Sequence, residues 1–512
     1  MDSIDPANLP PPAADVPLPL PRRADKKPSL RRRALLGAAG LAGAAALTRL
    51  ARAGELTPPP GPVMPTGSSL GKIDATVASL ESKIDTVDKK LVFGPTGIIE
   101  PRRAITSVSS SATAQYCITE SGAYYLTGNL IPEPGKDVCI EIKADHVDID
   151  GQGFAFLGGG GGGSGGCFKA LGRQSLEFYD FEVTGWHGPI CDFADCDDVY
   201  VSDVLMHACV NPDAGTPGGG VMIRCGDRCG IEDVSISACT GSTVQMGDSS
   251  YCFELCVTDS TGGGVRCGSG CCIEASHFIR VTGDVIVTAS SCAVTECDIR
   301  ACDGQAITTG SACVIECVEC VGGTGGGFHC ADGCCVEDCT VLNKDAMAIE
   351  CGSRSSITEN RVVLCWGMSC DSESCCFDNE LSSCSGGPDT AEGLGGAIVL
   401  RGAHSTCEQN SVSSSRVGIS VHQGASSSLV HENVVVCAGA GSDPVSGPTA
   451  GIAFHDGATS CMCTCNHLRA VQGTPPLLPG TCAFGPMAVL SPGDMSLTSP
   501  ASSHPLANTV MT

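Results

Sequence analysis

Residues 223–243, IRCGDRCGIEDVSISACTGST, decide the fold, because their pattern returns in equal steps along the chain without an insertion. Seven copies follow one another, and three positions of the unit are almost wholly apolar. Internal repeats of this kind indicate a repeat architecture and take precedence over any domain count from length. The three columns are Ile223, Val244, Val265, Ile286, Ile307, Phe328 and Ile349; Ile231, Cys252, Ile273, Val294, Ile315, Val336 and Ile357; and Ile236, Val257, Phe278, Ile299, Cys320, Val341 and Val362.

The step from Ile223 to Val244 gives a 21-residue period, with short β-type runs between glycine turns such as RCGDRC, RCGSGC and ECGSRS. This period is too short for paired-helix repeats. Two or three short strands per unit, joined by tight turns, predict the stacked coils of a parallel β-helix. The fold class is therefore all-β, a single-stranded solenoid. Similar runs before and after the strict block extend it to about fourteen coils, a length of about 65 Å at a strand spacing of about 4.8 Å.

Short asparagine motifs add a family resemblance. ITENRV, with Asn360 between Ile357 and Val362, is followed by the related CEQNSV and VHENVV. The chain from residue 100 to residue 470 resembles the right-handed parallel β-helix proteins of the pectate lyase-like superfamily. Its segments ITESGAYYLTGNL and VDIDGQGFAFLG resemble the opening of exported bacterial β-helix repeat proteins. The resemblance implies an asparagine ladder at one turn, and it leaves activity open because one fold hosts many functions.

Cysteine is abundant, with 36 residues in the chain. Cysteine partly replaces asparagine at the expected ladder position, which holds Val234, Leu255, Ser276, Cys297, Val318, Cys339 and Asn360. A second column holds Cys271, Cys292, Cys313 and Cys334. Three interpretations stay open. The thiols pack as small apolar groups, or neighbouring coils form disulfides such as Cys271–Cys292 and Cys313–Cys334. Thiolate metal sites are the third; their candidates are the CMCTC segment (Cys461, Cys463 and Cys465) and the doublets Cys271-Cys272, Cys334-Cys335 and Cys375-Cys376.

The N-terminus, residues 1–53, resembles a twin-arginine export signal. Arg32-Arg33-Ala34-Leu35-Leu36 matches the core of the motif, and Ala51-Arg52-Ala53 offers a small-residue cleavage site. The apolar run 34–47 is too short to span a bilayer as a helix. We expect an exported protein without a transmembrane helix, located in the periplasm, on the cell surface or outside the cell. A disordered basic leader is the alternative.

Two further segments lie before the repeats. Residues 54–69 form a proline-rich linker, and residues 70–93 carry a heptad stripe of Leu70, Ile73, Val77, Leu80, Ile84, Val87 and Leu91. β-Branched residues in both core columns favour a coiled coil that assembles a homotrimer through residues 70–91. The alternative is a single amphipathic helix on the protein's own body. Residues 471–512 are expected to be a C-terminal tail.

The chain is acidic, with 30 lysines and arginines against 56 aspartates and glutamates and a net charge of −26. This balance excludes nucleic acid as a partner, because phosphate binding needs a positive face. An acidic stripe next to the second apolar column is expected to point outwards or to lie at the turn. It is either a solubility device or a weak Ca²⁺ site. Its members are Glu232, Asp233, Glu254, Glu274, Glu296, Glu316, Glu337, Asp338 and Glu359.

One segment, DFADCDDVYVSD, is the best candidate for catalysis. Paired carboxylates cleave polysaccharides in many β-helix relatives, and Trp186 beside His187 is a possible sugar platform. Against catalysis, the polygalacturonase motifs are not present as a set, and no basic cluster is evident that would hold a polyuronate. The aspartates would otherwise cap strands and turns. The candidates are Asp192, Asp195, Asp197, Asp198, Asp203 and His187.

These observations favour a non-enzymatic acidic scaffold or binding protein of the cell surface or envelope. Its expected partner is a polysaccharide or another envelope component, with Ca²⁺ as a possible bound ion. The alternative function is a polysaccharide lyase or glycoside hydrolase that acts on acidic polysaccharide.

Overall fold

The computed structural model describes residues 102–158, 166–211, 220–385, 396–415, 417–437, 450–455 and 457–469, and four short strands beyond them. All of these belong to a compact unit of residues 99–512. The expected export signal, linker and coiled coil lie outside the described residues. In the part of the chain that the structure describes, no helix is long and apolar enough to cross a membrane.

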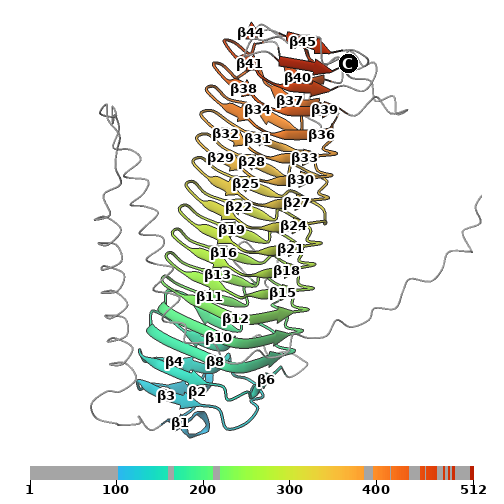
Figure 1. The fold of residues 1–512 in the computed structure, drawn as a ribbon. Helices are drawn as coiled ribbons and strands as arrows, with labels where there is room; N and C mark the ends of the chain where they lie inside the picture. Colours follow the sequence, from blue (N-terminus) through green and yellow to red (C-terminus); the bar gives the residue numbers. More distant parts are fainter. Residues whose placement is uncertain are drawn as a thin grey trace, which may run out of the picture. The chain divides into compact units, whose positions relative to one another are not determined.

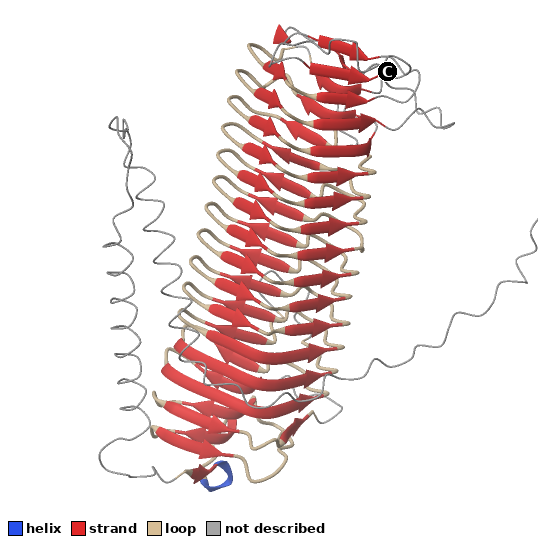
Figure 2. Ribbon diagram, in the orientation of Figure 1, coloured by secondary structure: helices blue, strands red, loops and turns tan. Residues whose placement is uncertain are grey.

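The described residues build a parallel β-helix, in which each strand pairs with strands of the coils before and after it (Figure 1). Strands and short turns make up nearly all of it, with one 3₁₀ turn, η2 (Ile105–Ser107), near its start (Figure 2). A 16-stranded sheet, called sheet B below, forms one side. Its strands are β2 (Ala114–Ile118), β4 (Val138–Ile142), β7 (Gly166–Ala170), β9 (Cys191–Phe193), β11 (Ile223–Cys225), β13 (Val244–Met246), β16 (Val265–Cys267), β19 (Ile286–Thr288), β22 (Ile307–Thr309), β25 (Phe328–Cys330), β28 (Ile349–Cys351), β31 (Met368–Cys370), β34 (Ile398–Leu400), β37 (Val417–Val421), β40 (Ala450–Phe454) and β43 (Leu477–Leu478).

A 30-stranded sheet, called sheet A, forms the rest, and most coils contribute two consecutive strands to it. Its strands are β1 (Arg103–Ala104), β3 (Gly122–Tyr125), β5 (Val147–Asp150), β6 (Ala155–Leu157), β8 (Gln174–Thr184), β10 (Asp197–His207), β12 (Gly230–Ser237), β14 (Tyr251–Phe253), β15 (Cys256–Thr258), β17 (Cys272–Glu274), β18 (His277–Ile279), β20 (Ala293–Thr295), β21 (Asp298–Arg300), β23 (Val314–Glu316), β24 (Glu319–Val321), β26 (Cys335–Glu337), β27 (Thr340–Leu342), β29 (Ser356–Thr358), β30 (Arg361–Val363), β32 (Cys375–Phe377), β33 (Glu380–Ser382), β35 (Thr406–Glu408), β36 (Ser411–Ser415), β38 (Leu429–His431), β39 (Val434–Cys437), β41 (Met462–Thr464), β42 (His467–Arg469), β44 (Ala483–Phe484), β45 (Met487–Leu490) and β46 (Asn508–Met511).

The repeat period predicted the register of these sheets. Val244 pairs with Val265 and Val265 with Ile286 in sheet B. Ile273 pairs with Val294 in sheet A. Sheet B has one strand per coil, so its 16 strands give more coils than the fourteen that the sequence predicts. The strands also continue past residue 470, from β43 to β46.

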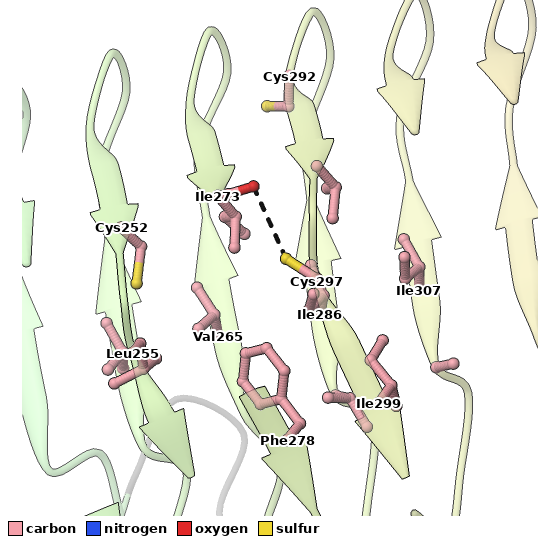
Figure 3. Close-up of a cluster of buried hydrophobic side chains, with 14 of the residues drawn as sticks. Cys252, Leu255, Val265, Ile273, Phe278, Ile286, Cys292, Cys297, Ile299 and Ile307 are labelled. Atoms are coloured by element: carbon pink, nitrogen blue, oxygen red, sulfur yellow. Dashed lines mark hydrogen bonds between the residues drawn. The ribbon is translucent and has the colours of Figure 1, made fainter. Parts of the chain in front are cut away.

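The three apolar columns point into the solenoid and form one continuous core. Figure 3 shows this packing for Val265, Ile273, Phe278 and Ile286, all of which are inaccessible to solvent. Period-2 alternation in each three-residue strand places the middle residue of sheet A strands inside and its neighbours outside. Burial of these columns is the main stabilising contribution, at about 25 cal/mol per Å² of apolar surface.

A sharp corner joins the two sheet A strands of each coil. The corner residue has a left-handed backbone, as at Glu254 (φ 52°) and Glu296 (φ 53°). The following residue is buried at the position expected for the asparagine ladder. From Asn360 onwards the ladder is continuous through Asn379, Asn410, Asn433 and Asn466, each joined to the next by amide hydrogen bonds. The ladder that the resemblance implies is therefore present in the C-terminal coils.

The described cysteines are free thiols, and most are buried. The pairs Cys271–Cys292 and Cys313–Cys334 are not bridged in the structure. Stacked thiols instead satisfy backbone groups at the corners. The Cys271 amide donates to Cys292 Sγ at 3.4 Å, and the Cys292 thiol donates to the Gly268 carbonyl at 3.2 Å. Cysteine is thus a small corner residue that offers both a donor and an acceptor, which explains its frequency in this chain.

Candidate metal centre on an acidic edge

The residues of the predicted catalytic segment lie in different parts of the coil. Asp192 lies in β9 on the outer face of sheet B, whereas Asp197 begins β10 in sheet A. His187 belongs to a separate column of isolated bridges, where it pairs with Val210. Trp186 is 3% exposed, so it is not a platform for a sugar. Residues that are neighbours in sequence therefore lie on different sides of the coil.

The aspartates of this segment have structural roles. Asp195, Asp198 and Asp203 all have a left-handed backbone, with φ of 56°, 56° and 52°. Arg228, one coil later, pairs with Asp198 at 2.9 Å and with Asp197 at 3.2 Å. An arginine that neutralises two carboxylates stabilises the turn and leaves neither of them available as a free base.

The acidic stripe forms one edge of the solenoid, which we call the acidic edge. Its carboxylates come from two adjacent columns. One column contains Glu274, Glu316 and Glu337, each the last residue of the first sheet A strand of its coil, and Glu232, which holds the same register position inside the longer strand β12. The other column is the left-handed corner itself and contains Asp233, Glu254, Glu296, Asp338 and Glu359. All of these residues are exposed except Glu274, which is half-buried, and Glu232, which is 5% exposed.

Glu232 differs from the rest of the acidic edge in its environment. Burial raises the pKa of its carboxyl to about 7, and the neighbouring charges of Asp233 and Glu254 add to this shift. Tyr200 donates a hydrogen bond to Glu232 Oε2 at 3.1 Å and opposes the shift. Glu232 is therefore a carboxyl that exchanges its proton near neutral pH.

The edge continues past the predicted residues into coils of irregular length. Glu408 pairs in register with His431, and the corner residue Glu432 follows His431. One ligand atom from each of these three side chains lies within 4.8 Å of the other two. Among the described residues, no three carboxylates of the predicted stripe converge in this way. Glu408, His431 and Glu432 are thus the metal-ligand group that the sequence analysis missed.

Hydrogen bonds hold this group in place. His431 Nδ1 lies 2.9 Å from Thr464 Oγ1, and its Nε2 lies 3.2 Å from Glu432 Oε1. Gln409 Nε2 donates to Glu432 Oε2 at 2.9 Å. The Gln409 hydrogen bond and the nearby imidazole lower the pKa of Glu432, which keeps the carboxylate charged. A ring nitrogen fixed by an outer partner leaves the other nitrogen for a metal, the usual arrangement of a histidine ligand.

The donor set determines which ion fits. Two carboxylates and one imidazole suit Zn²⁺ or Mn²⁺, whereas Ca²⁺ takes oxygen ligands and disfavours imidazole. Glu408 and His431 occur in CEQNSV and VHENVV, the motifs that indicate the asparagine ladder. Glu408 lies two residues before the ladder residue Asn410, and His431 and Glu432 lie two residues and one residue before Asn433. These positions are the sequence signal that could have identified the group.

Three basic residues and the acid Glu141 come together at another place on the surface. A shallow pocket of about 240 Å³ lies where β4 and β7 of sheet B end, and Lys143, Lys169 and Arg173 all line it. Lys143 pairs with Glu141 at 2.9 Å, and Arg173 lies 3.9 Å from Asp145. Lys169 is exposed. Three cations therefore meet at one corner of an otherwise acidic protein.

No protein-family model matches the sequence, and a comparison with curated protein sequences finds no match. Solved structures share the architecture. The A-module of mannuronan C-5 epimerase AlgE4 from Azotobacter vinelandii is 12% identical, and the match covers 75% of this chain and 100% of that chain with a TM-score of 0.33. The periplasmic alginate epimerase AlgG is 10% identical, covering 75% and 84%, with a TM-score of 0.26.

The catalytic domain of a GH87 α-1,3-glucanase is 9% identical, covering 77% of this chain and 69% of that chain, with a TM-score of 0.21. These likenesses concern the parallel β-helix architecture alone. Function is therefore argued from the residues of this chain.

Proposed function

We propose that this chain is an exported, non-catalytic, right-handed β-helix scaffold whose acidic edge binds divalent cations, with its best-defined site at Glu408, His431 and Glu432. The convergence of three ligand atoms within 4.8 Å carries the proposal. Thr464 and Gln409 hold the imidazole and one carboxylate from outside, so little side-chain entropy is lost when a cation arrives. Bound cations would let an acidic surface dock an anionic envelope polysaccharide.

Zn²⁺ binding to the purified full-length chain tests this function. At a free Zn²⁺ concentration of 100 times Kd, we expect the free energy of unfolding to rise by about 2.7 kcal/mol. This rise would be observed as a higher melting temperature that a chelator reverses. His431→Ala and Glu432→Gln should abolish the shift. Glu359→Gln is the matched control, because it removes an exposed carboxylate from the same corner column outside the ligand group.

The outcomes are distinct. An equal Zn²⁺ shift in His431→Ala and in the wild-type chain would exclude this site. A shift with Ca²⁺ alone that survives in His431→Ala would assign cation binding to the carboxylates of the acidic edge at large. Binding should also weaken in acid, because protons compete with the cation for the imidazole and the carboxylates.

A second candidate function is polysaccharide cleavage, and two observations favour it. Glu232 is a buried carboxyl with a pKa of about 7, a value suited to general acid–base catalysis. The basic pocket of Lys143, Lys169 and Arg173 would attract a polyuronate.

An activity screen on acidic and neutral polysaccharides tests this alternative, with ultraviolet absorbance for lyase products and a reducing-end assay for hydrolysis. Cleavage that is lost in Glu232→Gln and kept in Asp197→Ala would make the chain an enzyme. No turnover in the wild-type chain would leave the scaffold as the better function.

A further inference from the structure

Three sulfur atoms converge at one turn inside the solenoid. Cys267 ends β16, Cys271 follows it across the turn Gly268-Ser269-Gly270, and Cys292 occupies the position of Cys271 one coil later. The three Sγ atoms lie within 4.8 Å of one another. Cys271 and Cys292 are at most 2% exposed, and all three ligand groups are buried. The turn 268–270 beside them is half-buried, so it is the part of the wall that lies nearest to solvent.

This spacing matches three-coordinate metal ligation. With metal–sulfur bonds of about 2.3 Å, three sulfurs around one cation lie about 4.0 Å apart. The observed separations need only small side-chain rotations to reach that value. Soft thiolate ligands select soft cations such as Cu(I). In the described part of the chain, no histidine or carboxylate joins the three sulfurs within 4.8 Å, and three-coordination suits Cu(I) better than the four-coordinate Zn²⁺.

Backbone amides point at two of the three sulfurs. The Ser250 amide donates to Cys271 Sγ, and the Cys271 amide donates to Cys292 Sγ, both at 3.4 Å. The thiols of Cys271 and Cys292 in turn donate to the Gly247 and Gly268 carbonyls, both at 3.2 Å. The amide donors favour the thiolate that binds a metal, and the thiol protons leave the two carbonyls when the metal enters.

We propose that Cys267, Cys271 and Cys292 form a buried three-sulfur site for one Cu(I) ion. The ion enters from the half-buried turn, and the thiol protons that it displaces leave to solvent. This site is independent of the acidic edge, because it uses thiols of an inner corner rather than exposed oxygen and nitrogen ligands.

The test is an anaerobic titration of the reduced full-length chain with Cu(I), in competition with a Cu(I)-specific chelator. We expect the first equivalent to bind most tightly. Cys271→Ser and Cys292→Ser should each weaken that first equivalent by at least about 10-fold, as ligand loss exceeds the effect of outer-shell changes. X-ray absorption of the one-equivalent complex should show three sulfur neighbours at about 2.3 Å.

Cys297→Ser is the matched control. Cys297 lies on the same coil as Cys292, is 2% exposed, and does not belong to the three-sulfur group. Its thiol donates to the carbonyls of Thr295 and Ile273, and Figure 3 shows the second of these bonds. Its replacement should leave the first equivalent unchanged. The proposal is overturned if Cys271→Ser binds the first equivalent as tightly as the wild-type chain. It is also overturned if peptide mapping finds Cys271 in a disulfide with Cys267 or Cys292.

A gain of binding provides a test that does not depend on a damaged variant. Thr309 is 4% exposed, and its Oγ1 lies 3.7 Å from Cys334 Sγ, a contact between the same two columns as Cys267 and Cys292. Thr309→Cys would place a third sulfur beside Cys313 and Cys334, neither of which belongs to the proposed site. We expect it to raise the number of tightly bound Cu(I) ions, or the affinity of the second equivalent by at least about 10-fold. No change in either quantity would contradict the geometry on which the site rests.

Discussion

Replacing Asn410 with alanine should be among the most destabilising single changes in the C-terminal coils. Asn410 is fully buried in the asparagine ladder. Besides a weak bond to Cys407 Sγ at 3.3 Å, its Nδ2 makes three bonds to oxygen, to the carbonyls of Cys376 and Glu408 and to Asn433 Oδ1, at 2.9, 3.0 and 2.9 Å. Its Oδ1 accepts from both the backbone and the side-chain nitrogen of Asn379, at 3.1 and 2.8 Å.

The magnitude follows from what these five bonds leave behind. A buried hydrogen bond contributes about 1 kcal/mol net, and an unsatisfied partner costs more. The Asn379 side chain keeps its bond to the Ile357 carbonyl, and Asn433 Oδ1 keeps the Asn410 amide. These surviving bonds offset part of the loss, so we expect Asn410→Ala to cost about 4 kcal/mol.

A cysteine at this position should cost only about half as much. At Cys339, which holds the equivalent position, the thiol donates to the carbonyls of Ile315 and Glu337 at 3.7 and 3.1 Å. These two acceptors correspond to those of the Asn410 amide. Asn410→Cys restores two of the five bonds with weaker sulfur donors, and we expect a loss of about 2 kcal/mol.

Native-state hydrogen exchange is the assay, because a solenoid unfolds in parts and one global transition is not assured. The opening free energy of the Ser411 amide reports the local change, because this amide donates to the Asn379 carbonyl at 2.8 Å and keeps that backbone bond in both variants. The reasoning is refuted if the opening free energy of Asn410→Ala lies within about 1 kcal/mol of the wild-type value. It is also refuted if Asn410→Cys has a lower opening free energy than Asn410→Ala.

Three further changes test other features. Burial raises the pKa of Glu232 to about 7, so the folded state binds more protons than the unfolded state and stability falls as pH rises through 7. Glu232→Gln should therefore raise the free energy of unfolding at pH 8 by about 1–2 kcal/mol, after allowance for solvent screening, and leave it unchanged at pH 4.5. Thermal melts at the two pH values measure the difference. Gly304 has φ +112°, and an added Cβ would lie 2.7 Å from the Gly283 backbone, so Gly304→Ala should cost about 3 kcal/mol in chemical denaturation. Lys344 is 2% exposed with its Nζ 3.5 Å from the Cys302 carbonyl, so Lys344→Met should raise stability by about 1 kcal/mol, and a lower melting temperature would refute this.

The sequence predicted the architecture well because one physical constraint repeats. Each coil buries the first and last residues of its sheet B strand, so Ile223 and Val244 share a column, and the constant step between them specified the register. Cysteine at the corner was harder to interpret. Spacing alone does not distinguish a disulfide from a thiol that donates to a carbonyl, and only the atomic contacts of Cys271 and Cys292 separate the two.

The candidate sites were less predictable, because they depend on which sheet a residue belongs to and on the direction in which its side chain points. Asp192 and Asp197 are close in sequence, yet the turn between them leads from sheet B to sheet A. Asp197 therefore pairs with Arg228 and lies apart from Asp192. Glu408 and His431 are further apart in sequence than one strict period, yet they are neighbours in sheet A. The chain also turns at a left-handed corner residue such as Glu432. The alternation of inward and outward side chains along a strand therefore does not predict where its side chain points.

Both proposed metal groups arise where two columns meet, and this follows from the fold itself. A β-helix repeats each side chain about every 4.8 Å along its axis, so a single column offers pairs of like ligands. A third ligand must come from the next column, across a turn or corner. Cys267 supplies it beside Cys271 and Cys292, and Glu432 supplies it beside Glu408 and His431. A long column of carboxylates or thiols therefore does not by itself make a compact metal site, and a site forms only where the neighbouring column also places a ligand at the same coil.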